Sequence, residues 1–304
     1  MGDLSQGAAF IDDRYIPVAE ASISLLDWGF LHSDATYDVA HVWQGRFFRI
    51  DAYLDRFERS MQRLRMSVPY SREQIREVMF ELVRRSGLRD AYVEIVCTRG
   101  IPAPGSRDPR TCSNRFMAFA IPFVWIADDR LRAQGMNLLI SRHQRIPPES
   151  VDPRIKNYHW LDMVMGLFEA YDAGADSAVL VDAVGNLVEG PGFNIFVRCG
   201  DRVITPARGV LEGVTRATVL ELLAAEKLQV STELLPAAMA RAADEVFITS
   251  TAGGVMPVTQ ISGQAVGGGL PGALTARLND AYWALHDDPD YTTAINYGGA
   301  PNEE

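Results

Sequence analysis

The feature that most constrains the fold is the alternation of strand patterns and helix patterns in both halves of the sequence. In the first half, short strands surround an Asp-Asp turn, and a hairpin follows with Gln44-Gly45 at its turn. Apolar residues then recur at helical spacing. These patterns predict helices over 50–66 and 71–87, and then strands over 91–100 and 115–125.

The second half repeats this mixture after a pause near residues 127–135. The patterns predict strands over 136–142 and 245–250, a meander over 177–198, and helices over 161–174, 215–228 and 272–286. Strand runs mixed with helices in both halves predict an α/β (α+β) fold of two domains. We expect an N-terminal domain over 1–125, a linker over 126–135 and a C-terminal domain over 136–304.

Charge and cysteine content narrow the class of protein. The 304 residues carry a formal net charge of −10, which argues against nucleic acids and anionic membranes as partners. No apolar run approaches the roughly 20 residues of a membrane span. Cys97, Cys112 and Cys199 are scattered, which predicts reduced thiols in a cytoplasmic protein without a metal site.

Lysine is rare in this chain, and its rarity directs attention to one residue. Of 29 lysines and arginines only Lys156 and Lys227 are lysines. A lysine amine can deprotonate and attack a carbonyl carbon, whereas a guanidinium cannot. Lys227 lies late in a predicted amphipathic helix, which is typical of a solvated surface charge. Lys156 follows a proline and leads into "NYHW", so it is the candidate nucleophile.

Three further features suit a small anionic ligand. Glu189 ends the strand "LVEG", Thr215 begins a helix after Gly213, and Ser250-Thr251 precede two glycines directly after a strand. The last two can present backbone N–H groups to an anion. Each feature alone is more often a rim carboxylate, a helix cap or a tight turn. No dinucleotide or nucleoside-triphosphate motif is present, so the pattern favours a single phosphate monoester.

A lysine nucleophile, a carboxylate and a monophosphate site are the requirements of pyridoxal 5'-phosphate. With these residues in view, the sequence resembles the fold-type IV, or branched-chain/D-amino-acid, aminotransferase family from about residue 9 to residue 297. Within it the chain looks most like the (R)-selective amine transaminases. The family signature is represented here by Glu189, Pro191, Asn194, Ile195 and Phe196, and it continues through "LEGVTR".

The resemblance implies a role for each cofactor-binding position. Lys156 is implied as the aldimine lysine, and Glu189 as the partner of the pyridine nitrogen. The implied phosphate ligands are Arg56, Val214, Thr215 and Thr251. The resemblance also implies that the second domain is a pseudo-barrel and the first a smaller α/β domain. It implies a homodimer in which loops of the partner subunit close each active site.

The subfamily assignment depends on "FLHSDATYDVAHVW", "IKNYHW" and "STAGGVMP", which look like the (R)-amine group. The substrate-pocket residues implied are His32, Tyr37, Val39, Tyr92, Trp160 and Ala252. That group carries an arginine on the loop after "TRG" for the carboxylate of the acceptor. Counting along the loop from "TRG" places Gly105 at that position, so the candidate for binding the acceptor's carboxylate is the nearby Arg107.

The function implied is transfer of an amino group from an (R)-amine or amino acid to a keto acid such as pyruvate. The alternatives within the family are a branched-chain L-amino-acid or D-amino-acid aminotransferase and an aminodeoxychorismate lyase. Outside it, a Schiff-base aldolase also needs a lysine, and a non-catalytic cofactor-binding protein is a further alternative.

Overall fold

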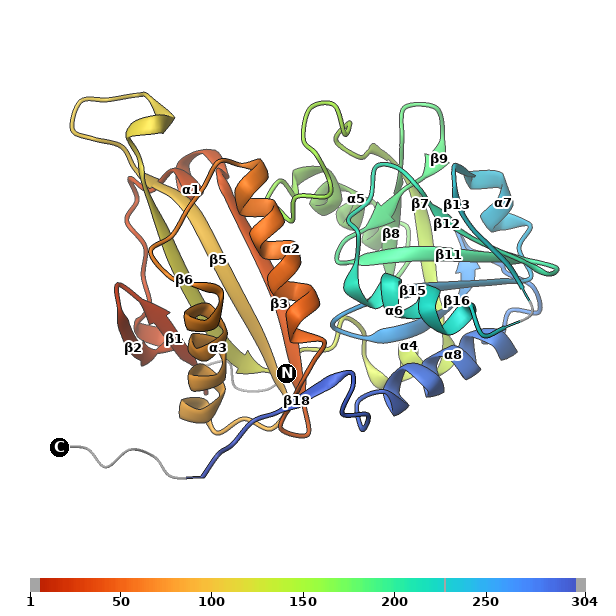
Figure 1. The fold of residues 1–304 in the computed structure, drawn as a ribbon. Coiled ribbons are helices and arrows are strands. Elements are labelled where there is room, and N and C mark those ends of the chain that lie inside the picture. Colours follow the sequence, from red (N-terminus) through yellow and green to blue (C-terminus); the bar gives the residue numbers. More distant parts are fainter. Residues whose placement is uncertain (1–5, 227, 299–304) are drawn as a thin grey trace. The chain divides into compact units, whose positions relative to one another are not determined.

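A computed structural model describes residues 6–226 and 228–298, and the chain divides into two compact units. The first unit comprises residues 1–124, 155–158 and 286–304, and the second comprises 125–154 and 159–285. Each unit is described by itself below (Figure 1). Within the described ranges, no helix is long and apolar enough to cross a membrane. Lys227 lies outside the described residues.

The first unit is built on one antiparallel sheet. Among the described residues its strand order is β18-β4-β3-β5-β6-β1-β2, and every neighbouring pair is antiparallel. The strands are β1 (Ala8–Ile11), β2 (Arg14–Pro17), β3 (Ala35–Trp43), β4 (Arg46–Phe48), β5 (Ala91–Ile101), β6 (Ser113–Pro122) and β18 (Thr292–Ala294). The helices are α1 (Trp28–His32), α2 (Ile50–Arg63) and α3 (Arg72–Ser86), with 3-10 turns at Val18–Glu20 and Pro109–Thr111.

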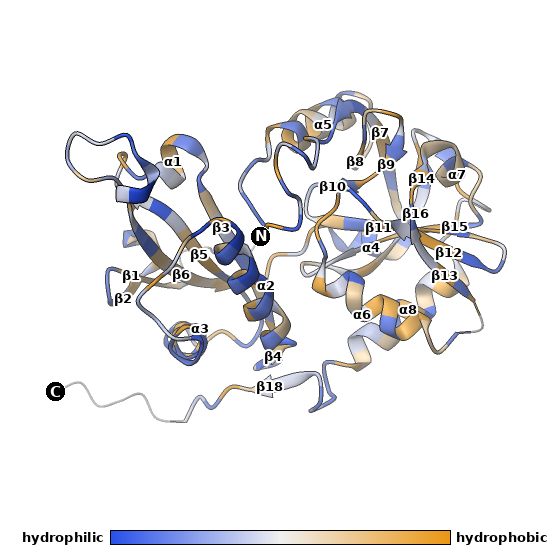
Figure 2. Cartoon of the chain, turned by 45° about the horizontal axis from the view of Figure 1, so that its top comes forward, coloured by the Kyte–Doolittle hydropathy of each residue, from blue (hydrophilic) through white to orange (hydrophobic). Residues whose placement is uncertain are grey.

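The two faces of this sheet have different roles. Helices α2 and α3 pack against one face (Figure 1), and Figure 2 shows that both helices are rich in hydrophilic residues. Successive side chains of a strand point to opposite faces. In β3, Asp38 therefore points toward α2, while Tyr37 and Val39 point to the other face. Cross-strand pairing adds Val96 and Glu94 of β5 to that second face.

Local sequence explains where these elements begin and end. Gln44 and Gly45 have positive φ values of 49° and 78°, and a two-residue loop of this kind matches the twist of the hairpin β3–β4. The predicted hairpin is confirmed. Helix α3 begins with a capping box between Ser71 and Gln74, and it ends at Gly87 in the left-handed conformation.

The second unit contains the larger sheet. Its main strand order, within the described ranges, is β13-β12-β11-β15-β16-β7-β8-β9-β14, with β10 beside β11 and β17 beside β16. The strands are β7 (Met136–Gln144), β8 (Ser177–Val181), β9 (Asn186–Leu187), β10 (Glu189–Gly190), β11 (Phe193–Cys199), β12 (Arg202–Pro206), β13 (Gln229–Glu233), β14 (Leu235–Pro236), β15 (Glu245–Ser250), β16 (Gly254–Ile261) and β17 (Gln264–Ala265). The helices are α4 (Asp129–Gln134), α5 (Leu161–Asp172), α6 (Val214–Leu223), α7 (Ala237–Arg241) and α8 (Ala273–Ala284).

This sheet curves into a nearly closed pseudo-barrel, as the resemblance implied. The N–H of Val188 donates to the carbonyl of Leu180 in β8, while Glu189 in β10 pairs with Asn194 in β11. The short segment 188–190 therefore joins β8 to β11 and closes the path of strands. Inward-facing aliphatic side chains such as Leu138 and Ile195 fill the interior. Glu189 consequently lies at the seam of the barrel.

The bounds of the two units differ from the predicted domain bounds. Residues 155–158 group with the first unit because Asn157 forms a bridge to Thr36 at the start of β3. Residues 286–298 also belong there, since β18 pairs with β4. The segment expected as a linker, 126–135, contains helix α4 of the second unit. Pairing between segments this far apart in the sequence cannot be predicted from the local pattern of either segment.

Candidate active site

The predicted site residues fall into two groups, one in each unit. In the first unit, Tyr37, Val39 and Tyr92 lie together on the sheet face that α2 and α3 leave uncovered. Strand pairing explains this grouping, because Val39 is opposite Glu94 in β5 and Tyr92 lies two residues before it. The predicted pocket residues of this unit therefore form one wall.

Lys156 is fixed against this wall by its backbone. Its carbonyl accepts the N–H of Tyr37 at 3.1 Å and the hydroxyl of Thr36 at 2.7 Å. Its Nζ lies 4.5 Å from the centroid of the Tyr37 ring, a cation–π distance. The main chain is thus held in place while the amine remains at the end of a flexible stem.

A buried carboxyl group that the sequence analysis missed lies in the same wall. Glu94 is 8% exposed and accepts hydrogen bonds from the hydroxyls of Tyr158 at 2.6 Å and Tyr92 at 3.2 Å. The Tyr158 ring stacks on Tyr37 with centroids 4.3 Å apart. Burial raises the pKa of Glu94, opposed by the Tyr158 hydrogen bond and the charge of Lys156. A glutamate in the otherwise apolar strand "AYVEIVC" was the available signal.

Arg56, the predicted phosphate ligand, forms a buried ion pair. Its Nε and Nη2 donate to the two carboxylate oxygens of Asp38 at 2.8 and 2.7 Å. Arg56 is 3% exposed and Asp38 is fully buried. Burial tends to lower the pKa of Arg56, but the charge of Asp38 outweighs it and raises that pKa. Asp38 was not anticipated as a partner, although it stands beside the predicted Tyr37.

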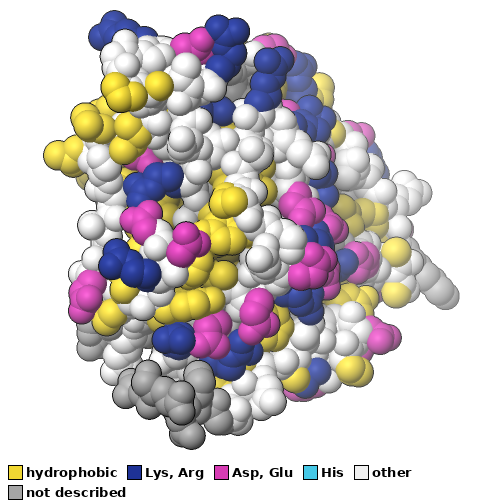
Figure 3. Space-filling view, turned by 60° about the vertical axis from the view of Figure 1, so that its left-hand side comes forward, with side chains coloured by type: hydrophobic (Ala, Val, Ile, Leu, Met, Phe, Trp, Pro, Cys, Tyr) yellow, Lys and Arg dark blue, Asp and Glu magenta, His cyan; other side chains and the backbone are white. Residues whose placement is uncertain are grey.

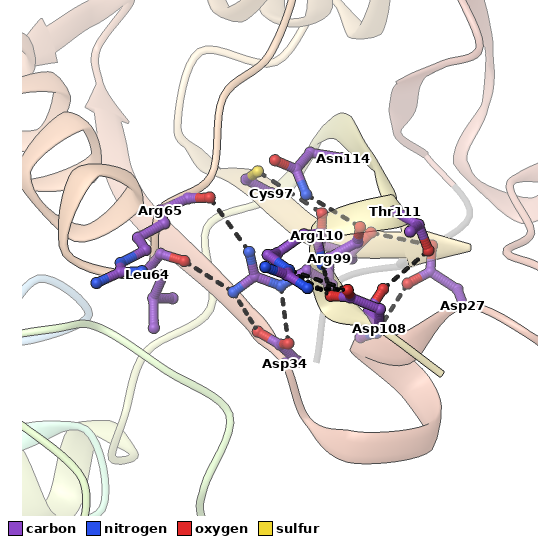
Figure 4. A network of polar contacts seen from close by, with 12 residues as sticks. Asp27, Asp34, Leu64, Arg65, Cys97, Arg99, Asp108, Arg110, Thr111 and Asn114 are labelled. Carbon is purple, nitrogen blue, oxygen red and sulfur yellow. Dashed lines mark hydrogen bonds and ion pairs between the residues drawn. The ribbon is translucent and has the colours of Figure 1, made fainter. Parts of the chain in front are cut away.

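The loop with Arg107 connects β5 and β6, and Figure 4 shows the polar network at its base. Arg99 donates to both oxygens of Asp34, at 2.8 and 3.1 Å, and to the carbonyl of Leu64. Within the loop, Arg110 is paired with Asp108, which lowers the pKa of that carboxyl group. Arg107 is exposed and forms no hydrogen bond or ion pair within the described residues. It is therefore available to a ligand, whereas Arg110 is not.

His32 is placed differently from the other predicted pocket residues of this unit. It ends α1, its side chain is exposed, and its ring packs edge-on against Trp28 at 4.8 Å. The structure does not bring it into the wall of Tyr37, Val39 and Tyr92, and no contact supports a role inside that wall. Its role in substrate binding stays a prediction.

In the second unit, Glu189 is held on two sides. Its Oε1 accepts the Nε–H of Arg145 at 3.2 Å, and its Oε2 accepts the N–H of Leu211 at 2.8 Å. Arg145 also donates to Asp162 at 2.8 Å. Arg145 and Asp162 were not predicted from the sequence, since neither is close to Glu189 in the chain. Glu189 is 4% exposed, which suits it to pair with a buried cationic N–H group.

The N-terminus of α6 has the features of an anion site. Its N-cap is Gly213, which offers no side chain to the free N–H groups of the first turn, so Val214 and Thr215 follow an uncapped end. Thr215 is 2% exposed and its hydroxyl has no hydrogen-bond partner. Arg216 is buried and donates only to Thr205 and the carbonyl of Pro206 within the described residues. Burial lowers the pKa of Arg216, and the charges of Glu212 and Glu189 oppose this shift without cancelling it.

The turn after β15 brings Thr251 and Ala252 close to Gly192. The Ser250 hydroxyl donates to the carbonyl of Gly192 at 2.8 Å and accepts the N–H of Ala252 at 3.2 Å. Trp160, at the start of α5, lies beside the same glycine. Trp160 therefore lies near Gly192, and Ala252 lies in the turn that is hydrogen-bonded to Gly192, while their role in one substrate pocket stays a prediction. The Ser250 hydroxyl thus accepts one N–H of this turn, and Thr251 stays a predicted phosphate ligand.

Comparison with known proteins identifies the family of the chain. The model of the amino-transferase class IV family matches residues 35–261. A Methanocaldococcus jannaschii protein, named provisionally as a branched-chain-amino-acid aminotransferase, is 31% identical over 90% of this chain and 94% of its own. The D-alanine aminotransferase of Bacillus licheniformis is 27% identical over 88% of this chain and 93% of its own.

A solved structure extends the likeness to the whole fold. The T.th. branched-chain amino acid aminotransferase, solved with pyridoxamine 5'-phosphate, superposes with a TM-score of 0.89 at 26% identity. The match covers 95% of this chain and 99% of that one. The fold and the family match together define a fold-type IV aminotransferase. The chain belongs to the amino-transferase class IV family.

Proposed function

We propose that the protein uses pyridoxal 5'-phosphate to transfer the amino group of an (R)-amine to a keto acid such as pyruvate. The observation that supports the donor class is Glu94, a buried carboxyl group in the wall beside Lys156. A donor carboxylate brought to this wall meets another carboxyl group. An amine without a carboxylate leaves no buried charge unpaired.

The cofactor itself is supported by the residues of the second unit. The orphaned hydroxyl of Thr215, the free N–H groups of α6 and the charge of Arg216 together favour a phosphate. Glu189 accepts a hydrogen bond from Arg145, and its buried carboxyl group suits the protonated nitrogen of a pyridine ring. Arg56, Val214 and Thr251 remain proposed phosphate ligands.

The chain's own residues then have distinct tasks. Bound pyridoxal phosphate supplies an electron sink for charge that develops at the donor's Cα. Lys156 would hold the cofactor, and its Nζ amine would accept the proton of the donor's Cα and return it. Glu189 keeps the ring nitrogen protonated, which stabilises the transition state electrostatically. Tyr37, Val39 and Tyr92 orient the donor's substituents.

The second candidate function is a branched-chain L-amino-acid or D-amino-acid aminotransferase. It is favoured by the names of the relatives, which include branched-chain and D-alanine aminotransferases. The two candidates differ in whether the donor carries a carboxylate, and Glu94 is the residue that separates them.

A donor screen tests the proposal. With pyruvate as acceptor, we expect (R)-1-phenylethylamine to be converted about 10- to 200-fold faster than the (S) form. The (S) form exchanges the positions of the phenyl and methyl groups, so that one of them no longer fits its part of the pocket. Initial rates for both enantiomers, L-leucine and D-alanine give the comparison. Glu94→Gln, whose amide can accept from one tyrosine hydroxyl and donate to the other while carrying no charge, is expected to raise the relative rate with amino-acid donors. Activity confined to L-branched-chain amino acids assigns the protein to the second candidate.

We propose Arg107 as the partner of the acceptor's carboxylate. Arg107→Ala is expected to slow the keto-acid half-reaction by about 2- to 5-fold, since an exposed ion pair contributes up to about 1 kcal/mol. The amine half-reaction should change less than 2-fold in single-turnover measurements, by the same estimate. Arg110→Ala is the matched control on the same loop, because Arg110 already pairs with Asp108. Equal losses in the two variants would assign the effect to loop structure.

We further propose that the protein is a homodimer. Helix α5 buries Met163, Gly166 and Ala170, yet its opposite side is also apolar, and a helix apolar all round is normally covered. The exposed apolar residues are Leu161, Val164, Met165, Phe168 and Tyr171 on α5, and Ile23, Leu25, Leu26, Phe30 and Leu31 in the first unit. Figure 3 shows exposed hydrophobic patches of this kind between charged side chains.

Sedimentation measurements test the dimer. The wild type is expected to sediment as a dimer, and Phe168→Glu to shift it toward the monomer, because the variant places a charge in an apolar contact. Val184→Glu is the control, since Val184 is 82% exposed on a turn outside both patches. A monomeric wild type contradicts the proposal.

A further inference from the structure

A buried triad of charged side chains lies at the seam of the barrel in the second unit. Arg145 stands between two carboxylates, with Nε 3.2 Å from Glu189 Oε1 and Nη1 2.8 Å from Asp162 Oδ2. The side chains of Arg145, Asp162 and Glu189 are 8%, 10% and 5% exposed. A pair at this degree of burial is screened little by solvent, so its charges act strongly on each other.

Each member of the triad is anchored by regular structure. Arg145 directly follows β7, and its N–H donates to the carbonyl of Val181 in β8. Asp162 is in the first turn of α5 and also accepts the N–H of Ile146 at 2.8 Å. Glu189 begins β10. Three elements therefore converge on one guanidinium, and its planar fork holds the two carboxylates in a set geometry.

The charges of the triad do not balance. One guanidinium between two carboxylates leaves a net charge of −1 in a buried place. Arg216 also interacts with Glu189 through space, and it interacts with Glu212 as well. A cationic N–H donor at Glu189 neutralises the remaining charge. Burial lowers the pKa of Arg145, but the two carboxylates outweigh this and raise it, so Arg145 stays charged at every working pH.

We propose that Arg145, held in place by Asp162, is a positioning residue that keeps Glu189 ionised and oriented toward the ring nitrogen of the cofactor. This inference rests on the proposed function, because it needs a pyridine ring at Glu189. Arg145 touches neither substrate nor cofactor and acts through Glu189. The ionised carboxylate in turn determines how firmly the ring nitrogen holds its proton.

The opposite charges of Arg145 and Asp162 give a test that structural damage alone does not reproduce. In Arg145→Gln, Glu189 loses its counter-charge and the ring nitrogen holds its proton less firmly. An unprotonated ring withdraws less charge from the imine that joins the cofactor to Lys156, so that imine keeps its proton to higher pH. The pH midpoint of the visible absorbance, which reports the protonation of this imine, is therefore expected to shift upward by about one pH unit or more. In Asp162→Asn, Arg145 pairs with Glu189 alone, so the pH midpoint of the visible absorbance is expected to stay the same or to move down. Arg145→Lys should restore most of the wild-type midpoint.

The experiment uses the holoenzyme, with cofactor affinity of each apo-variant titrated in parallel. If Arg145→Gln does not fold, the double variant Arg145→Gln/Asp162→Asn removes both charges and carries the test, with an upward shift expected. A midpoint equal to wild type in the variant that folds overturns the role of Arg145. Shifts in the same direction for Arg145→Gln and Asp162→Asn also overturn it, because they indicate damage to the seam. A wild type that acquires no visible absorbance with pyridoxal phosphate instead refutes the proposed function.

Discussion

Replacing Lys156 with alanine is expected to abolish turnover, by about 10⁴-fold or more, while leaving the protein folded. The expected loss is large because one amine both holds the cofactor and moves the proton. The fold should survive because Lys156 is fixed through its backbone carbonyl, which accepts hydrogen bonds from Tyr37 and Thr36 in any variant. Steady-state rates and circular dichroism measure the two quantities.

Two controls separate the chemistry of the amine from its charge. Lys156→Arg keeps a cation but cannot form an imine, so it should be as inactive as the alanine variant. Lys227→Ala should retain wild-type activity, since only Lys156 is proposed to react. Borohydride reduction of the holoenzyme should fix the cofactor to Lys156, as located by mass spectrometry of the digested protein. An adduct on Lys227 contradicts the assignment.

Most of the fold was predictable because its elements carry strong local patterns. The helices α2, α3, α5, α6 and α8 all lie within or close to their predicted ranges. The short elements α1, α4 and α7 were missed, since five or six residues do not show a helical period. The pairing of β18 with β4 joins residues about 245 positions apart, and neither segment carries a sequence pattern that predicts its partner.

The candidate site was predictable only where residue chemistry is distinctive. A rare lysine and a carboxylate after a strand stood out, and the family resemblance then assigned their partners. The residues that were missed, Asp38, Glu94, Arg145 and Asp162, are charged groups buried by tertiary contacts. On sequence alone each is an ordinary surface charge, because burial decides which charges matter and burial follows from the fold. A charged residue inside an apolar strand is the one signal that could have singled out Asp38 and Glu94.

The buried ion pair changes what is expected of the predicted phosphate ligand Arg56. Removing Arg56 leaves the carboxylate of Asp38 fully buried and unpaired. Breaking a buried pair in this way costs about 3–5 kcal/mol of the free energy of unfolding. Loss of a charge-assisted contact to a phosphate costs a further 1.5–3 kcal/mol, but of cofactor affinity, or roughly 10- to 150-fold in Kd. A single variant therefore mixes two effects.

A pair of variants separates them. Arg56→Met fills a similar volume without charge and is expected to lose both stability and cofactor affinity. Arg56→Met/Asp38→Asn removes the unpaired charge as well, and Asn can still accept the N–H of Val39 that Asp38 accepts at 2.7 Å. The double variant should recover half or more of the lost stability in urea unfolding of the apo-protein, since replacing both partners costs less than breaking the pair. Its cofactor affinity should stay low, because the phosphate has still lost its guanidinium. If the double variant instead recovers cofactor affinity together with stability, Arg56 acts only in the ion pair with Asp38 and does not bind the phosphate.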